Sequence, residues 1–82
     1  MLDALRNAPC RTAGVKQVLR ALSAGKAERV YLATDVEQYL GEKILSACRA
    51  AGLDAQRCAT MRELGKACGI DVKAACAAIL RL

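Results

Sequence analysis

The sequence contains no histidine, tryptophan or phenylalanine, and it has a single proline. Without histidine, nucleophilic catalysis of the Cys–His type is excluded. With Tyr31 and Tyr39 as its only aromatic residues, the chain also lacks the stacking surfaces of proteins that bind single-stranded nucleic acid. No phosphate-loop motif and no paired-carboxylate pocket is evident, so we expect no enzymatic activity, no cofactor and no small-molecule substrate. An enzyme built on Ser46, Thr12 or the cysteines is the weakest alternative.

The cysteines do not form a metal-binding pattern. Their number is odd, no two of them have the C-x-x-C spacing, and no histidine accompanies them, so zinc and iron–sulfur sites are not expected. No signal-like hydrophobic stretch opens the chain, and no run is long enough to cross a membrane. We therefore expect a cytoplasmic protein without a membrane partner, in which reduced thiols serve as small core residues. These residues are Cys10, Cys48, Cys58, Cys68 and Cys76.

The length of 82 residues predicts one domain spanning residues 1–82. This is near the lower limit for a chain that folds without disulfide bonds or a bound metal. Apolar residues make up 55% of the sequence, but many of them are alanines. A core of Ala, Val, Leu and Ile requires close contact between thin layers. The composition therefore favours a compact layered α/β domain.

The chain is basic, with a formal net charge of +5 and a pI near 9.2. Such a surface attracts polyanions, of which nucleic acid is the usual one. Because aromatic side chains are scarce, a nucleic-acid partner is expected to be recognised through its backbone, grooves and shape. A basic domain with no specific polyanionic partner is the alternative.

The first part of the chain predicts a short helix at residues 2–8 that ends at Pro9. Residues 10–13 are too short to assign by pattern, and an initial strand is one interpretation of them. A clear helix then opens at Gly14 and stops at Gly25. Its apolar stripe has the spacing i, i+3, i+4 and i+7. The stripe consists of Val15, Val18, Leu19 and Leu22.

The middle of the chain predicts a buried strand at residues 30–34. Thr34 and Glu37 have the spacing of a capping box, which predicts a helix that starts there and ends at Gly52. The apolar stripe of this helix consists of Val36, Leu40, Ile44, Ala47, Cys48 and Ala51. Residues 55–59 form a weak strand candidate.

A second capping-box match, Thr60 to Glu63, predicts a helix that Gly69 closes. The alanines of residues 73–82 favour a helix by propensity, but a strand covered on both faces also shows no alternation. Alternating helices and strands predict a three-layer α/β/α sandwich around a small mixed sheet.

One helix face has the composition of a nucleic-acid contact. Lys16, Gln17 and Arg20 lie opposite the apolar stripe of the helix that Gly14 opens. The first N–H groups of a helix are unpaired and its dipole is positive there, so a phosphate can approach closely past a glycine. The Gln17 amide can both donate and accept at a base edge. The alternative is an ordinary solvated helix face.

Residues 14–20 (Gly-Val-Lys-Gln-Val-Leu-Arg) and the closing segment 63–72 (Glu-Leu-Gly-Lys-Ala-Cys-Gly-Ile-Asp-Val) resemble two motifs of one family. This is the kink-turn-binding ribosomal protein family of the L7Ae, L30e and Gadd45 type. Archaeal and eukaryotic members typically have Asn-Glu and Lys at the reading positions. This chain has Lys16-Gln17 and Arg20, which is similar to the bacterial L7Ae-like branch.

The resemblance implies that the helix face reads tandem sheared G·A pairs in the major groove and that the loop after Cys68 packs against a flipped-out nucleotide. It also implies a strand for residues 73–82 and places Glu37 close to the RNA. The residues implied to bind RNA are Gly14, Val15, Lys16, Gln17, Arg20, Glu37, Lys66, Cys68, Gly69, Ile70 and Asp71. For Ile70, a place in the core beside a helix cap is the alternative, and for Glu37 a capping role.

The expected function is recognition of kink-turns in ribosomal or regulatory RNA, with the ribosome as a candidate partner. A protein-interaction or ribosome-assembly adaptor on the same fold, without kink-turn specificity, is the alternative.

Overall fold

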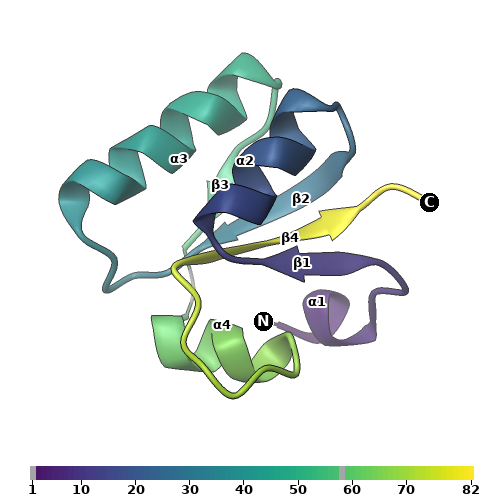
Figure 1. Cartoon of the computed structure of the whole chain (residues 1–82), viewed down its shortest axis with the longest axis vertical. Helices are drawn as coiled ribbons and strands as arrows, with labels where there is room; N and C mark the ends of the chain where they lie inside the picture. The colour runs from purple at the N-terminus through teal and green to yellow at the C-terminus, as the bar shows by residue number, and fades with distance from the viewer. Residues whose placement is uncertain (1, 58) are drawn as a thin grey trace.

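The computed structural model describes residues 2–57 and 59–82. Helices and strands alternate along most of the chain, as Figure 1 shows. The elements in chain order are α1 (Asp3–Asn7), β1 (Arg11–Ala13), α2 (Val15–Ser23), β2 (Ala27–Leu32), α3 (Gln38–Ala50), β3 (Ala55–Gln56), α4 (Met61–Ala67) and β4 (Cys76–Leu80).

The strands form one mixed four-stranded sheet in the order β1-β4-β2-β3. β4 is antiparallel to both of its neighbours, and β2 is parallel to β3. It follows that β1, β2 and β3 run in one direction, so that their carboxyl ends and the beginning of β4 lie along the same edge. We call this the carboxyl edge of the sheet.

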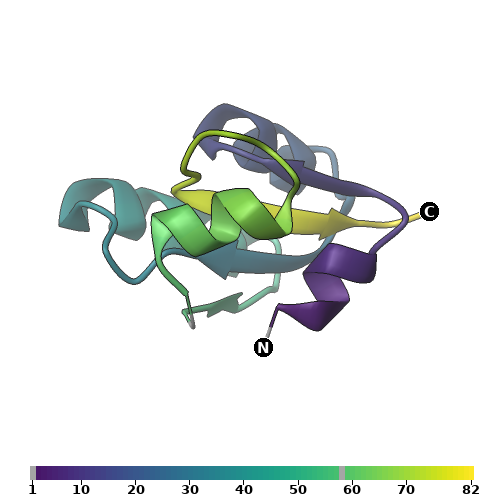
Figure 2. The same cartoon turned by 90° about the horizontal axis from the view of Figure 1, so that it is seen from below.

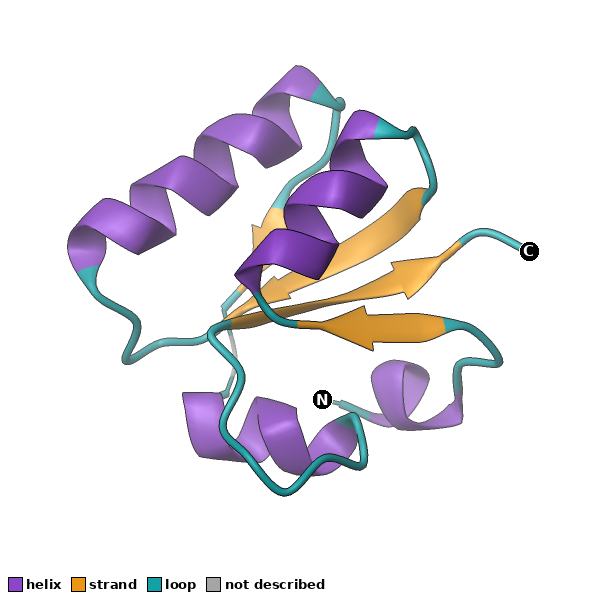
Figure 3. Ribbon diagram, in the orientation of Figure 1, coloured by secondary structure: helices purple, strands orange, loops and turns teal. Residues whose placement is uncertain are grey.

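The sheet is covered on both faces, which confirms the predicted α/β/α sandwich. α2 and α3 pack on one face, and α1 and α4 pack on the other (Figures 1 and 3). Successive residues of β2 alternate between the layers: Val30 and Leu32 belong to the core under α2 and α3, whereas Tyr31 belongs to the core under α1 and α4. Two small cores therefore share one thin sheet.

The alanine-rich C-terminal segment forms β4, between β1 and β2. Ala77 and Ala78 are fully buried and point to opposite faces of the sheet. Pairing along both edges of β4 and burial on both faces outweigh the helix propensity of alanine, which is worth less than about 1 kcal/mol per residue. The strand that the resemblance implied for residues 73–82 is confirmed, with the shorter span Cys76–Leu80.

The capping box predicted for Thr34 and Glu37 is wrong. α3 begins only at Gln38, and its N-cap Glu37 makes no side-chain capping bond. The backbone N–H of Thr34 instead donates to the carbonyl oxygen of Ala59 (2.8 Å). Residues 33–37 thus form a connection that holds the end of β2 against the start of α4. Sequence spacing could not reveal this, because the partner is distant in the chain.

Other boundaries also differ from the predicted ones. β2 begins at Ala27 and ends at Leu32, earlier than the predicted 30–34. β3 spans Ala55–Gln56, within the predicted 55–59, of which residue 58 lies outside the described residues. Ala51, expected in the apolar stripe of α3, is exposed beyond the end of that helix.

The second capping box is confirmed. The N–H of Glu63 donates to the hydroxyl of Thr60 (3.2 Å), and the N–H of Thr60 donates to the Glu63 carboxylate (2.9 Å). These bonds hold the pKa of Glu63 below its ordinary value. α4 therefore starts at a defined residue, which fixes where the following loop leaves it.

The predicted core role of the cysteines is confirmed for Cys48 and Cys76, which are buried, whereas Cys10 and Cys68 are half-buried and Cys58 lies outside the described residues. Burial raises the pKa of Cys76 to about 12. Because the thiolate is the reactive form, we expect alkylation of native Cys76 to stay slow as the pH rises through the ordinary thiol range near about 8.5. Mass spectrometry of peptides after timed labelling measures this. Labelling of native Cys76 as fast as in denaturant would contradict the prediction.

Candidate nucleic-acid interface

Several connecting segments meet at the carboxyl edge of the sheet. The N–H of Gly14, before α2, donates to the carbonyl oxygen of Cys76 (2.9 Å). The N–H of Ala33, after β2, donates to the carbonyl oxygen of Ala75 (2.9 Å). The N–H of Ala74 donates to the carbonyl oxygen of Met61 at the start of α4 (2.9 Å). These bonds tie the starts of two helices to the segment that enters β4.

The N-terminus of α2 lies at this edge and is uncapped. Its N-cap Gly14 has φ 99° and ψ 151°, a backbone conformation that residues other than glycine rarely adopt, and no side chain caps the helix. Its first N–H groups are therefore available to an anion. Lys16, Gln17 and Arg20 are exposed as predicted, while Val18 is buried behind them. The amphipathic pattern of α2 thus presents two cations and one amide to solvent.

The segment after α4, residues 68–75, is called the α4–β4 loop. It turns at Gly69 (φ 75°), where the N–H of Ile70 donates to the carbonyl oxygen of Gly65 (3.1 Å), and then returns alongside α4 (Figure 2). Gly65 allows this close return, because a Cβ there would overlap the carbonyl oxygen of Val72. The loop is therefore pressed against α4 backbone to backbone.

The α4–β4 loop exposes apolar side chains in basic surroundings. Ile70 is 39% exposed and Val72 is 68% exposed, so Ile70 is not tucked into the core. Both line a hollow of about 220 Å³ between the loop and α4. The residues lining the hollow are Arg62, Lys66, Ile70, Asp71, Val72 and Lys73. Aliphatic side chains beside free cations suit a ligand with an apolar face and an anionic part.

The cations of both surfaces form no ion pair closer than 4 Å with the described residues. Within residues 2–57 and 59–82, the only such ion pair joins Arg6 and Asp3 (3.9 Å). Lys16, Arg20 and Lys66 therefore keep their full charge available for phosphate.

A family model described as "Ribosomal protein L7Ae/L30e/S12e/Gadd45 family" matches residues 3–81. The chain belongs to this family. It is 46% identical over 70 residues to RNA-binding protein TTE2299 of Caldanaerobacter subterraneus subsp. tengcongensis, covering 85% of each chain. It is also 43% identical over 68 residues to RNA-binding protein YbxF of Geobacillus stearothermophilus, covering 83% of each.

A solved structure, the Giardia lamblia 15.5kD RNA binding protein, superposes with a TM-score of 0.84 over 99% of this chain and 71% of that one. A Bacillus halodurans protein of unknown function superposes with a TM-score of 0.83 over 98% and 80%. At 24% and 21% identity, these two likenesses show the family fold alone. The predicted family resemblance is confirmed.

The residues that the resemblance implied do not all play the same part. Lys66, Ile70 and Asp71 line the hollow, whereas Cys68 and Gly69 form the turn that closes α4. Burial raises the pKa of the Cys68 thiol, in keeping with a packing role. Glu37 is exposed at the carboxyl edge, and among the described residues its side chain forms no hydrogen bond. Contact of any of these residues with RNA stays a prediction.

Three residues that line the hollow were not predicted from the sequence: Val72, Arg62 and Lys73. One signal was available, because Arg62 and Lys66 are four residues apart and so share one face of α4. For Val72, the spacing of two from Ile70 in a loop carried no such periodicity. Its exposure depends on how the loop returns along Gly65.

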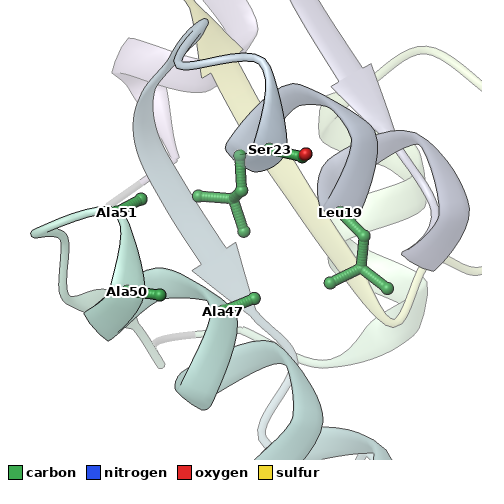
Figure 4. A pocket seen from close by; sticks show the side chains of 6 residues that line it. Leu19, Ser23, Ala47, Ala50 and Ala51 are labelled. Carbon is green, nitrogen blue, oxygen red and sulfur yellow. The ribbon is translucent and has the colours of Figure 1, made fainter.

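A second, apolar groove of about 340 Å³ separates α2 from α3 (Figure 4). It is lined by Leu19, Leu22, Ser23, Ala47, Ala50 and Ala51. Leu19, predicted as a core residue, is half-buried and forms part of its wall. None of the described residues that line this groove is charged, so it does not extend the basic surface.

In residues 2–57 and 59–82, no helix combines the length and apolar character needed to cross a membrane. The same part of the chain holds no cluster of three or more His, Cys, Asp or Glu side chains suited to a metal ion.

Proposed function

We propose that this chain is an RNA-binding protein that recognises kink-turns, in ribosomal or regulatory RNA. The observation that carries the proposal is the position of two different surfaces on one edge of the sheet. The uncapped start of α2 adjoins the beginning of β4 through the hydrogen bond from Gly14 to Cys76, and the α4–β4 loop leads directly into that strand. The names of the similar bacterial proteins, which describe them as RNA-binding, support it.

In this proposal the α2 face provides both charge and discrimination. Lys16 and Arg20 contact phosphates, and the free N–H groups after Gly14 add a fixed positive dipole. Gln17 contacts the edges of the sheared G·A pairs, because its amide can donate and accept at once. The major groove of a regular RNA helix is too deep and narrow for such a contact, so a distorted segment is required.

The α4–β4 loop contacts the unpaired part of the same RNA. Ile70 and Val72 cover the face of an unstacked base, which needs no hydrogen bond for burial. Lys66 and its basic neighbours in the hollow hold the adjoining phosphate. An extended RNA cannot occupy both surfaces, so the protein selects the bent form and shifts the RNA equilibrium toward it.

Gln17 tests whether the chain reads structure or only charge. We expect Gln17→Ala to weaken binding to a kink-turn by about 1–3 kcal/mol, because a base-edge contact is lost, and to leave binding to plain duplex unchanged. Titrations use a kink-turn RNA and the same RNA with Watson–Crick pairs in place of the G·A pairs. Gln56→Ala, an exposed change on β3 at the far side of the sheet, is the matched control.

The titrations separate the competing functions. A wild-type protein that binds both RNAs equally would be a nonspecific basic domain, and one that binds neither would favour the adaptor function. If Gln17→Ala and the control bind the kink-turn with equal affinity, Gln17 does not contact the G·A pairs.

A further inference from the structure

A third hollow runs along the side of α2 that faces the edge strand β1. It has a volume of about 290 Å³, and we call it the α2–β1 groove. Its lining residues are Thr12, Gln17, Arg20, Ala21, Ala24, Lys26 and Leu80. The groove therefore begins beside Gln17 and Arg20, on the face of α2 proposed to contact RNA, and continues to the opposite end of that helix.

The charge of the α2–β1 groove is of one sign. Among the described residues that line it, Arg20 and Lys26 are the charged ones, and none is a carboxylate. Neither cation has an ion-pair partner within 4 Å among residues 2–57 and 59–82. The groove between α2 and α3, on the other flank of the same helix, is lined in the described part of the chain by uncharged residues alone (Figure 4). A polyanion that is bound at the start of α2 and extends along the helix is thus attracted to the flank beside β1 and not to the flank beside α3.

Lys26 is held in a defined position at the far end of the groove. Its N–H donates to the carbonyl oxygen of Ala21 (2.9 Å), and its own carbonyl oxygen accepts from the N–H of Arg81 (2.8 Å). Lys16 lies in the first turn of α2, roughly 10 Å along the axis from Ser23 at its end, since a helix rises about 1.5 Å per residue, and Lys26 lies beyond that end. A nucleotide bound at the start of α2 cannot reach Lys26, but a stem that continues along the helix can.

We propose that the backbone of an RNA stem flanking the bend lies in the α2–β1 groove, where Lys26 and Arg20 contact its phosphates. The Thr12 hydroxyl, on the floor of the groove, donates to the same strand. This inference rests on the proposed function, and it extends the footprint from the bend itself to one regular helix beside it. A contact of this kind adds affinity and orientation without reading sequence.

The test is Lys26→Ala, with Lys43→Ala on the exposed surface of α3 as the matched loss of one charge. Binding is titrated against salt with a kink-turn RNA, and with two versions in which one stem or the other is cut short. We expect Lys26→Ala to bind the full RNA several-fold more weakly, with a log–log salt slope less steep by about one. The loss should vanish when one particular stem is shortened. Thr12→Val should weaken binding with no change of slope, because it removes no charge.

The alternative role of Lys26 is to complement the negative end of the α2 dipole, which predicts a loss of stability with no change of binding. Unchanged binding of Lys26→Ala, or a loss that persists on both shortened RNAs, would overturn the inference. Failure of the proposed function has a different signature. In that case wild type binds kinked and Watson–Crick-paired RNA equally, and Lys26→Ala weakens binding to both.

Discussion

Gly65→Ala is expected to destabilise the protein and to weaken its binding to kinked RNA. The added Cβ overlaps the carbonyl oxygen of Val72 and lies 3.1 Å from its carbonyl carbon and 3.2 Å from the Cα of Lys73. These are backbone atoms, so the loop itself has to move. Overpacking of this kind costs about 1–3 kcal/mol or more, and the better helix propensity of alanine returns less than about 1 kcal/mol.

Urea unfolding measures the first effect, as a lower midpoint with an unchanged slope. Titration of the folded variant with kink-turn RNA measures the second, because displacement of the α4–β4 loop moves Ile70 and Val72 away from the base that they cover. The matched control is Gly41→Ala in α3, whose new Cβ lies 3.0 Å from the guanidinium end of the flexible Arg57 side chain. We expect this control to be neutral or slightly stabilising. A Gly65→Ala variant as stable as the control would show that the loop does not depend on this close approach.

Replacing both Lys16 and Arg20 by alanine is expected to have the largest effect on binding. Both side chains are exposed and take part in no ion pair among the described residues, so the fold should tolerate their loss. Two phosphate contacts disappear, and the log–log salt slope should become less steep by about two, or one per contact. Because the contacts are electrostatic, the loss of affinity should be greatest at low salt.

The control for this pair is Lys43→Ala with Arg49→Ala, two exposed cations of α3. It removes the same net charge from a different surface. If the two double variants lose equal affinity, overall charge explains the binding and the α2 face has no special role. If a folded Lys16/Arg20 variant keeps the affinity and slope of the wild type, the assignment of this face is wrong.

Those features that depend on neighbouring residues could be predicted from the sequence. The apolar stripe of α2 indicated which of its faces is exposed, because a helix places residues three and four apart on one side. Thr60 and Glu63 fixed the start of α4 through bonds between residues three apart. Gly69 ended the helix, because only glycine adopts its positive φ without strain. The alternation of such elements was sufficient to predict the layered α/β architecture.

The tertiary structure decided what depends on contacts between distant parts of the chain. The C-terminal alanines form a strand because β1, β2 and both helical layers surround them. No local pattern distinguishes such a buried strand from a helix. Asp35 accepts a hydrogen bond from the N–H of Met61 (2.8 Å), 26 residues away, instead of capping the helix that follows it. The exposure of Val72 and the position of Lys26 at the end of a basic groove arise in the same way. Each depends on which backbone segments pack together, and residue spacing along the chain does not encode that packing.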